Sequence, residues 1–287
     1  MFYLIFAAVL WSFSFGLIKS ELAHLDPVLV ALIRLSLSFL VFLPFLRKTG
    51  PARARCLLGI GAVQFGFMYV LYIYSYRFLE GHQVALLTVT TPIFVVLFDA
   101  VFQKKWRWRY WLGAALALIG AAVLLEPGDH MAPRLAGLLL IQGANLCFAL
   151  GQVLYKQNVA ETEPMIDHFA WLYLGGLLVP LIFSGPGLMR ALPQPFGINQ
   201  IGSLLYLGLI PSGLGFFLWN RGVLLVNSGL AAVLNNLKIP LGAAVAWLVF
   251  REEPDPKRFF LSMIIMALAL TITLRNKTSS PQENPIA

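Results

Sequence analysis

Charged residues are scarce in this sequence. Only 12% of its 287 residues are charged and 59% are hydrophobic, whereas soluble domains average about 25% charged and about 45–50% apolar residues. A soluble fold of this size cannot bury so much apolar surface. The composition therefore excludes an ordinary soluble domain and predicts a chain that resides in a lipid bilayer.

Motifs of catalysis and metal binding are also missing. The two cysteines, Cys56 and Cys147, lie far apart and form neither a disulfide framework nor a metal motif. No Walker A stretch or nucleophile motif is present. An intramembrane enzyme would need clustered acids or histidines at a membrane face, and the nearest acids, Glu252, Glu253 and Asp255, share one loop. We therefore expect no cofactor and no enzymatic activity.

Ten runs of mostly apolar residues are each long enough for a membrane-spanning helix, which needs about 17–25 residues. The first run lacks the basic start and the cleavage site of a signal peptide, so we interpret it as a span. The predicted fold is an all-α integral membrane protein of ten transmembrane helices, with a disordered polar tail at 276–287. The runs lie at about 2–18, 28–46, 57–79, 83–102, 109–125, 134–156, 167–184, 200–220, 228–250 and 257–274.

The net charge of +8 comes from basic residues in short loops, a pattern typical of membrane proteins and not of nucleic-acid binding. With a cytoplasmic N-terminus, the opposite loops of the first half carry only Lys19 and Arg77. Because cytoplasmic loops are enriched in Lys and Arg, we predict a bacterial-type inner-membrane protein with both termini cytoplasmic. The cytoplasmic loops of that half carry Arg47, Lys48, Arg53, Arg55, Lys104, Lys105, Arg107 and Arg109.

The two halves of the chain repeat, with a first unit at 1–126 and a second at 134–275. Pro240 follows Pro92 by 148 positions, and earlier segments repeat at an offset of 137. Each repeat has five spans, so the second must enter the membrane in the opposite orientation. Accordingly, the loop QKKWRWR after the fourth span is basic, whereas its counterpart REEPDPKR has no net charge. Inverted repeats are a common plan of secondary transporters, which hold their substrate near the midplane between the halves.

Four segments carry a resemblance to a known family: AVLWSFSFGLIK, DPVLVALIR, VALLTVTTPIFVVLF and LNNLKIPLGAAVAWLVFREEP. The chain resembles the drug/metabolite transporter superfamily, specifically its EamA type. The resemblance implies two five-helix repeats around a central cavity lined by spans one, three, four, six, eight and nine. One departure is that Gln103 and Lys104 stand where the family's first repeat usually has a Glu, which only the second repeat keeps, at Glu252 or Glu253. A mechanism with a symmetric pair of acids is therefore doubtful.

Lys238 is the first candidate for substrate binding. It lies near the middle of the 228–250 run, about 15 Å from either end, where a charge is costly and usually faces a cavity or a partner. Asn235 lies one turn earlier on the same face. Pro92 and Pro240 are expected to break their helices, because proline lacks a backbone N–H. We favour Lys238 as an anchor for a substrate carboxylate or phosphate; the alternative is a structural lysine bonded to carbonyls that the proline frees.

Aromatic and amide side chains are further candidates. Tyr69, Tyr72 and Tyr76 share one face of the third span, where they would either contact the substrate or form a packing seam between helices. Asn145, Gln152 and Asn220 would either line a polar cavity or hydrogen-bond neighbouring helices. Trp11 and Trp171 are also candidates, although packing is favoured for both.

Other polar residues have simpler explanations. We expect Arg34 to extend toward the membrane interface, in preference to closing a gate with Asp26 or Asp167. We expect Thr88 and Thr91 to bond their own helix.

No acid lies in the middle third of any predicted span, whereas proton-coupled export of cationic drugs needs one. The sequence therefore predicts a secondary transporter, an exporter or exchanger, that moves small polar metabolites such as amino acids by alternating access. The alternative is an exporter of drugs or cationic amines. Its partners would be the substrate, the lipid bilayer and either a proton or a counter-substrate, with no nucleic acid; monomer and homodimer both remain open.

Overall fold

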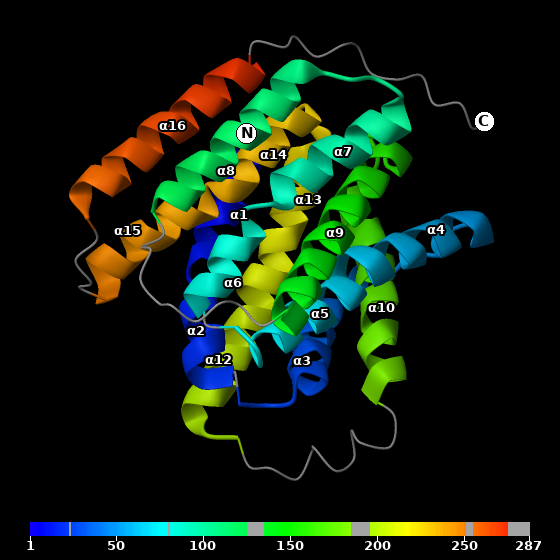
Figure 1. Cartoon of the computed structure of the whole chain (residues 1–287). Helices are drawn as coiled ribbons and strands as arrows, with labels where there is room; N and C mark the ends of the chain where they lie inside the picture. The colour runs from blue at the N-terminus through cyan, green and yellow to red at the C-terminus, as the bar shows by residue number, and fades with distance from the viewer. Residues whose placement is uncertain (23, 80, 125–134, 185–195, 251–254, 275–287) are drawn as a thin grey trace.

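The computed structural model describes residues 1–22, 24–79, 81–124, 135–184, 196–250 and 255–274. Within these ranges the regular elements are all helices (Figure 1), which confirms the predicted all-α fold class. The predicted tail at 276–287 and the acids Glu252 and Glu253 lie outside the described residues.

The first half contains α1, α2, α3, α4, α5, α6, α7 and α8 and three short irregular helices, η1, η2 and η3. Their bounds are α1 Phe2–Ser12, α2 Ser14–Leu17, η1 Ile18–Leu22, α3 Pro27–Phe42, η2 Leu43–Phe45, α4 Pro51–Gly61, η3 Ala62–Phe67, α5 Met68–Ser75, α6 Gly81–Thr88, α7 Thr91–Gln103 and α8 Trp108–Val123. The second half comprises α9 Leu135–Asn158, α10 Met165–Ser184, α12 Ile198–Leu207, η4 Gly208–Gly215, α13 Phe216–Leu224, α14 Ser228–Asn236, α15 Lys238–Phe250 and α16 Pro256–Leu274.

Seven helical stretches among the described residues are long and apolar enough to cross a membrane. The predicted first and fifth spans correspond to shorter apolar helices, α1 and α8, and the ninth is divided at Leu237 between α14 and α15. That these three segments also cross the membrane, which would make ten spans, stays a prediction. The seven are Pro27–Phe45, Pro51–Ser75, Gln83–Gln103, Leu135–Asn158, Met165–Ser184, Ile198–Leu224 and Pro256–Leu274.

Both halves share two backbone irregularities. The third span of the first half widens into a π-helix at η3, and the equivalent span of the second half does so at η4. The fourth span of each half is interrupted just before its proline: α7 begins one residue before Pro92, and α15 begins two residues before Pro240. Proline cannot donate the hydrogen bond that would continue the preceding helix, so the repeat in sequence becomes a repeat of helix breaks.

The two halves interlock instead of folding as separate units. Spans that occupy equivalent places in the two repeats pack against each other: α3 packs with α10, α7 with the α14 part of the ninth span, and α8 with α16. The contact between α5 of the first half and α9 of the second has its counterpart in the contact between α13 of the second half and α1 of the first. This exchange pattern is what a two-fold relation between the repeats produces. In Figure 1 the N-terminus, the α7–α8 connection and the end of α16 all lie toward the upper end of the molecule.

Glycine allows the closest of these helix contacts. A Cβ atom on Gly61 of α4 would lie 1.8 Å from the backbone oxygen of Leu172, and one on Gly175 of α10 would lie 2.1 Å from that of Leu58. Gly113 and Gly120 of α8 pack against α16 of the same chain. Small residues let helix backbones approach where the surrounding lipid offers no hydrophobic driving force for association.

Candidate functional site

A cavity lies where the two halves meet. Its empty volume, including the part open to the outside, is about 620 Å³. Of the residues proposed from the sequence to bind substrate, six line it: Trp11, Tyr69, Tyr72, Asn145, Asn235 and Lys238. The lining comes from all six spans that the family resemblance implied, and from α3 as well, through Arg34.

Lys238 occupies the first position of α15, directly after the break at Leu237. Its ammonium donates a hydrogen bond to Asn235 Oδ1 at 3.2 Å, so the side chain of Asn235, which is buried, points its oxygen at the amine. An ammonium has three donors, and this is its one hydrogen bond within the part of the chain that the structure describes. Lys238 therefore keeps donors that can bind a ligand.

Arg34 is buried in the cavity wall, with an exposed fraction of 2%. Its guanidinium donates to Ser212 Oγ from Nε at 3.2 Å and from Nη2 at 3.0 Å, and Nη2 also donates to the Tyr69 hydroxyl at 3.2 Å. The expectation that Arg34 extends to the interface is therefore wrong. The structure also contradicts the alternative of a gate with Asp26 or Asp167, because Asp26 pairs with Arg77 and Asp167 pairs with Arg47, each at 3.4 Å. Hydrogen bonds to Ser212 of η4 and Tyr69 of α5 hold this side chain inside the protein.

Aromatic rings form the apolar part of the wall. The centroid of the Trp11 ring lies 5.0 Å from that of Phe216 and 6.0 Å from that of Phe148. Trp11 Nε1 donates to the backbone oxygen of Pro211 at 3.0 Å, which fixes the ring against the π-helical turn. Tyr72 bonds Tyr76 hydroxyl to hydroxyl at 2.9 Å, although Tyr76 itself does not line the cavity.

The candidate amides divide between two roles. Asn145 lines the cavity and also donates to the backbone oxygen of Leu87, at 2.8 Å. Asn220 and Gln64 exchange two hydrogen bonds, at 2.9 and 3.2 Å, across the third spans of the two repeats. Gln152 accepts a hydrogen bond from Trp219 at 2.9 Å. Asn220 and Gln152 are away from the cavity lining, so they tie helices together.

Trp171 also lies away from the cavity. Its indole N–H donates to the backbone oxygen of Arg47 at 3.0 Å, outside the cavity lining. Thr88 and Thr91 bond carbonyls of their own chain segment, at 2.7 Å each, as expected, and nevertheless face the cavity.

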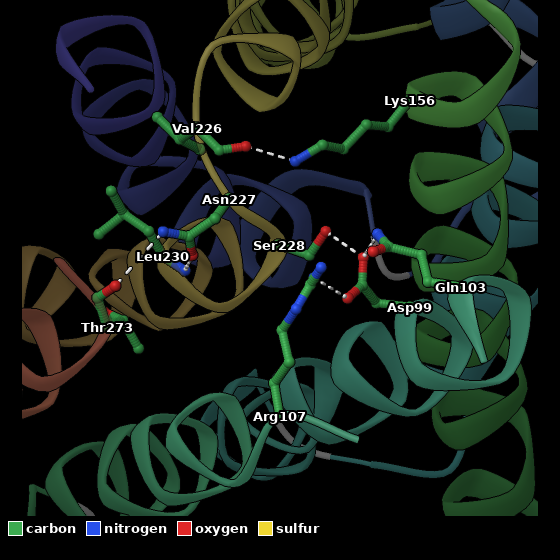
Figure 2. A network of polar contacts seen from close by, with 9 residues as sticks. All are labelled: Asp99, Gln103, Arg107, Lys156, Val226, Asn227, Ser228, Leu230 and Thr273. Carbon is green, nitrogen blue, oxygen red and sulfur yellow. Dashed lines mark hydrogen bonds and ion pairs between the residues drawn. The ribbon is translucent and has the colours of Figure 1, made fainter. Parts of the chain in front are cut away.

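A polar cluster joins the halves at the end of α7 (Figure 2). Asp99, which is 3% exposed, accepts hydrogen bonds from Gln103 at 2.7 Å, from Ser228 at 2.5 Å and from Arg107 at 3.3 Å. We call these four residues the Asp99 cluster. Ser228 begins α14 of the second half, whereas the other three come from the first. The cluster therefore ties α7 and α8 to the start of α14.

Further polar contacts continue this seam. Asn227 caps α14 by accepting from the Leu230 backbone N–H at 2.8 Å, and donates to the backbone oxygen of Thr273 at 3.3 Å. Lys156 of α9 donates to the backbone oxygen of Val226 (Figure 2). Beyond the end of α9, Glu163 pairs with Arg53 at 2.5 Å. Of these contacts, the Arg53–Glu163 pair joins the two repeats, whereas those of Asn227 and Lys156 lie within the second.

Comparison with known proteins gives the same picture over almost the whole chain. The model of the EamA-like transporter family matches residues 1–126 and 135–274. The biotin transporter of Salmonella typhimurium is 37% identical over 278 residues, covering 94% of this chain and 91% of that protein. The probable biotin transporter of Pseudomonas aeruginosa is 36% identical over 282 residues, covering 95% and 96%. A crystal structure with 18% sequence identity shows the same fold, with a TM-score of 0.76 over 96% of this chain and 98% of the other.

Proposed function

Since the chain belongs to the EamA-like transporter family, we propose that it carries biotin across the bacterial inner membrane through the cavity between its two repeats. It is a multi-pass membrane transporter and not an enzyme, as its relatives and its family are transporters. Biotin falls within the small polar metabolites expected from the sequence. The amino acids given there as an example find no support among these relatives.

The observation that carries the proposal is the charge of the cavity. Arg34 and Lys238 both line it, and its lining within the described residues contains no Asp or Glu. In a low-dielectric site such a pair attracts an anion and repels a cation. Cationic amines are therefore poor candidates for this cavity, whereas a small carboxylate is a good one.

The rest of the wall suits the body of biotin. Biotin consists of a carboxylate, a flexible alkyl chain and a fused ring system with a cyclic urea. Binding sites for such molecules are mostly apolar, with a few polar groups that fix orientation. Trp11, Phe148 and Phe216 supply the apolar surface here. Lys238, at the break between α14 and α15, would hold the carboxylate.

The inverted repeats support transport by alternating access, in which one repeat moves against the other around a central site. Because Lys238 and Arg34 come from different repeats, a substrate between them would contact both moving parts.

Uptake of biotin tests the proposal. We expect the chain to restore growth on low biotin, and accumulation of radiolabelled biotin, in a biotin-requiring bacterium that lacks its own transporter. Unlabelled biotin should compete, whereas biotin methyl ester, which lacks the carboxylate, should not. If labelled biotin does not enter although the protein is present in the membrane, the proposal is wrong; counterflow of labelled amino acids in proteoliposomes would then test the earlier expectation.

Substitution of Lys238 tests the anchor. Lys238→Ala should lower biotin uptake at least about tenfold, because hydrogen bonds to charged groups contribute about 1.5–3 kcal/mol. Lys105→Ala is the matched control, since Lys105 is exposed in the α7–α8 connection. Uptake by Lys238→Ala equal to that of the wild type would show that another group holds the acid.

A further inference from the structure

Arg34 is a buried cation that has no anionic partner among the described residues. Its side chain makes no ion pair within the described part of the chain, and its neighbours Ser212 and Tyr69 are neutral hydroxyls. The Tyr69 ring also lies beneath the guanidinium, 4.6 Å from ring centroid to Cζ. Buried charges are usually paired or serve a function, so this arrangement calls for a role beyond packing.

Counting donors shows which part of Arg34 is available. A guanidinium has five N–H donors: one on Nε and two on each Nη. Nε bonds Ser212, and the two donors of Nη2 bond Ser212 and Tyr69. Nη1 is buried and has no hydrogen-bond partner within the described structure. Three of the donors are therefore engaged on one edge of the guanidinium, and Nη1 is the nitrogen whose donors have no partner among the described residues.

The geometry of that remaining nitrogen favours a carbonyl oxygen over a carboxylate. A carboxylate prefers two parallel N–H donors from two nitrogens of the fork. Either fork of Arg34 includes Nη2, whose donors are already engaged. A single carbonyl oxygen needs only the Nη1 donors. Lys238, a compact point charge, lies in the same cavity for the carboxylate.

We propose that Arg34 Nη1 donates to the urea oxygen of biotin, and that Ser212 and Tyr69 are positioning residues that hold the guanidinium for it. This inference rests on the proposed function and deepens it. The cavity then has two polar poles, Arg34 for the urea and Lys238 for the acid. The rings of Trp11 and Phe216 lie against each other on the wall of this cavity, and Phe216 also contacts Tyr69, with ring centroids 5.9 Å apart.

Comparison of two substrates, biotin and lipoate, distinguishes the role of Arg34 from that of Lys238. Lipoate carries the same alkyl carboxylate as biotin on a sulfur-containing ring, but it has no urea. Unlabelled biotin and lipoate each compete with labelled biotin for the wild type. We expect a lower inhibition constant for biotin than for lipoate. In Arg34→Gln we expect biotin binding to fall about tenfold to a hundredfold, whereas inhibition by lipoate stays within about twofold of the wild type. Because Arg34→Gln binds biotin weakly, its constants are measured by thermal shift of the purified protein.

Ser212→Ala provides a second variant in case the loss of Arg34 prevents folding. It leaves the charge in place and removes the acceptor of two of the arginine's hydrogen bonds. The preference for biotin over lipoate should fall in this variant too, with the protein still folded. Ser203→Ala is the matched control, because Ser203 is a buried serine that does not line the cavity.

The outcomes are distinct. If the wild type takes up biotin but both variants keep its preference for biotin over lipoate, Arg34 does not bind the urea oxygen. The proposed function still stands in that case. If Arg34→Gln loses biotin and lipoate equally, Arg34 binds the carboxylate and the assignment of the poles is wrong. If the wild type does not bind biotin at all, this inference fails together with the proposed function.

Discussion

The Asp99 cluster should control access to the cavity from its end of the molecule. If that end opens during transport, the hydrogen bond between Asp99 and Ser228 must break, since Ser228 belongs to the second repeat and Asp99, Gln103 and Arg107 all belong to the first. Asp99→Asn preserves the size of the side chain but removes its charge. The Oδ1 that accepts from Ser228 and Gln103 can be kept, whereas an amide donor replaces the Oδ2 that accepts from Arg107.

The cost follows from the contacts. A hydrogen bond to a charged group contributes about 1.5–3 kcal/mol and one between neutral groups about 0.5–1.5 kcal/mol, and the contact with Ser228 is buried. The ion pair with Arg107 lies within the first repeat, so opening does not break it. Asparagine can keep the bond to Ser228 through its Oδ1 but carries no charge, so the closed form loses about 1–1.5 kcal/mol, which shifts the equilibrium toward opening about fivefold to tenfold.

Accessibility of an engineered cysteine measures that shift. In a background with Cys56 and Cys147 replaced by serine, Val226→Cys places a thiol at the seam, where Val226 is 9% exposed. A membrane-impermeant maleimide should label it much faster with Asp99→Asn than without. Asp255→Asn is the control, because its ion pair with the neighbouring α16 is exposed. Unchanged labelling in a folded Asp99→Asn protein would refute the idea that this cluster holds the end closed.

Two further predictions concern how the repeats hold together. Gly61→Ala should abolish or severely reduce the yield of folded protein, because its Cβ would meet the backbone oxygen of Leu172 at 1.8 Å, whereas Gly59→Ala on the same helix meets nothing within 4 Å and should be tolerated; size-exclusion profiles in detergent decide this, and equal profiles would contradict the close approach. Gln64→Leu should lower the free energy of unfolding by about 1–3 kcal/mol, because it leaves the buried amide of Asn220 unpaired. Adding Asn220→Leu should cost less than a second such loss, as measured by denaturant unfolding, and strictly additive costs would show that the two amides do not interact.

The helices and the internal repeat of this fold could be predicted because the sequence features that mark them depend on local chemistry. Apolar runs, basic loops and paired prolines follow from the solvent and from the backbone, so helices and repeats could be located without a structure. The third span was predicted to begin at 57, whereas the structure extends its helix back to Pro51. The basic residues Arg53 and Arg55 had suggested a loop there, but long basic side chains at a helix end can reach polar surroundings.

Contacts between distant segments were less predictable. The interface position expected for Arg34 rested on its distance from the end of its own span, and nothing local pointed to its partner Ser212, 178 residues away. The Gly- and Pro-rich stretch GLIPSGLG around Ser212 was the available signal, because it forms the π-helical turn that brings the serine to α3. Similarly, the pairing of Gln64 with Asn220 needs the packing of the two third spans.

Comparison of equivalent positions in the two repeats adds information that neither repeat gives alone. At the offset of 137, Arg34 corresponds to Trp171, and at the offset of 148, Lys238 corresponds to Thr90. Trp171 bonds a backbone oxygen outside the cavity lining, and Thr90 bonds the amide of Gln142; neither is charged.

Both cavity cations therefore stand where the two repeats differ, whereas the helix breaks stand where they agree. A pseudo-symmetric scaffold can open alternately to its two ends, but a substrate with two unlike polar ends requires an asymmetric site. Positions at which one repeat carries a charge and the other a neutral residue, within the spans expected to line the cavity, are hence the places to look for specificity. That comparison would have singled out Lys238 directly, and Arg34 once its span was recognised as part of the wall.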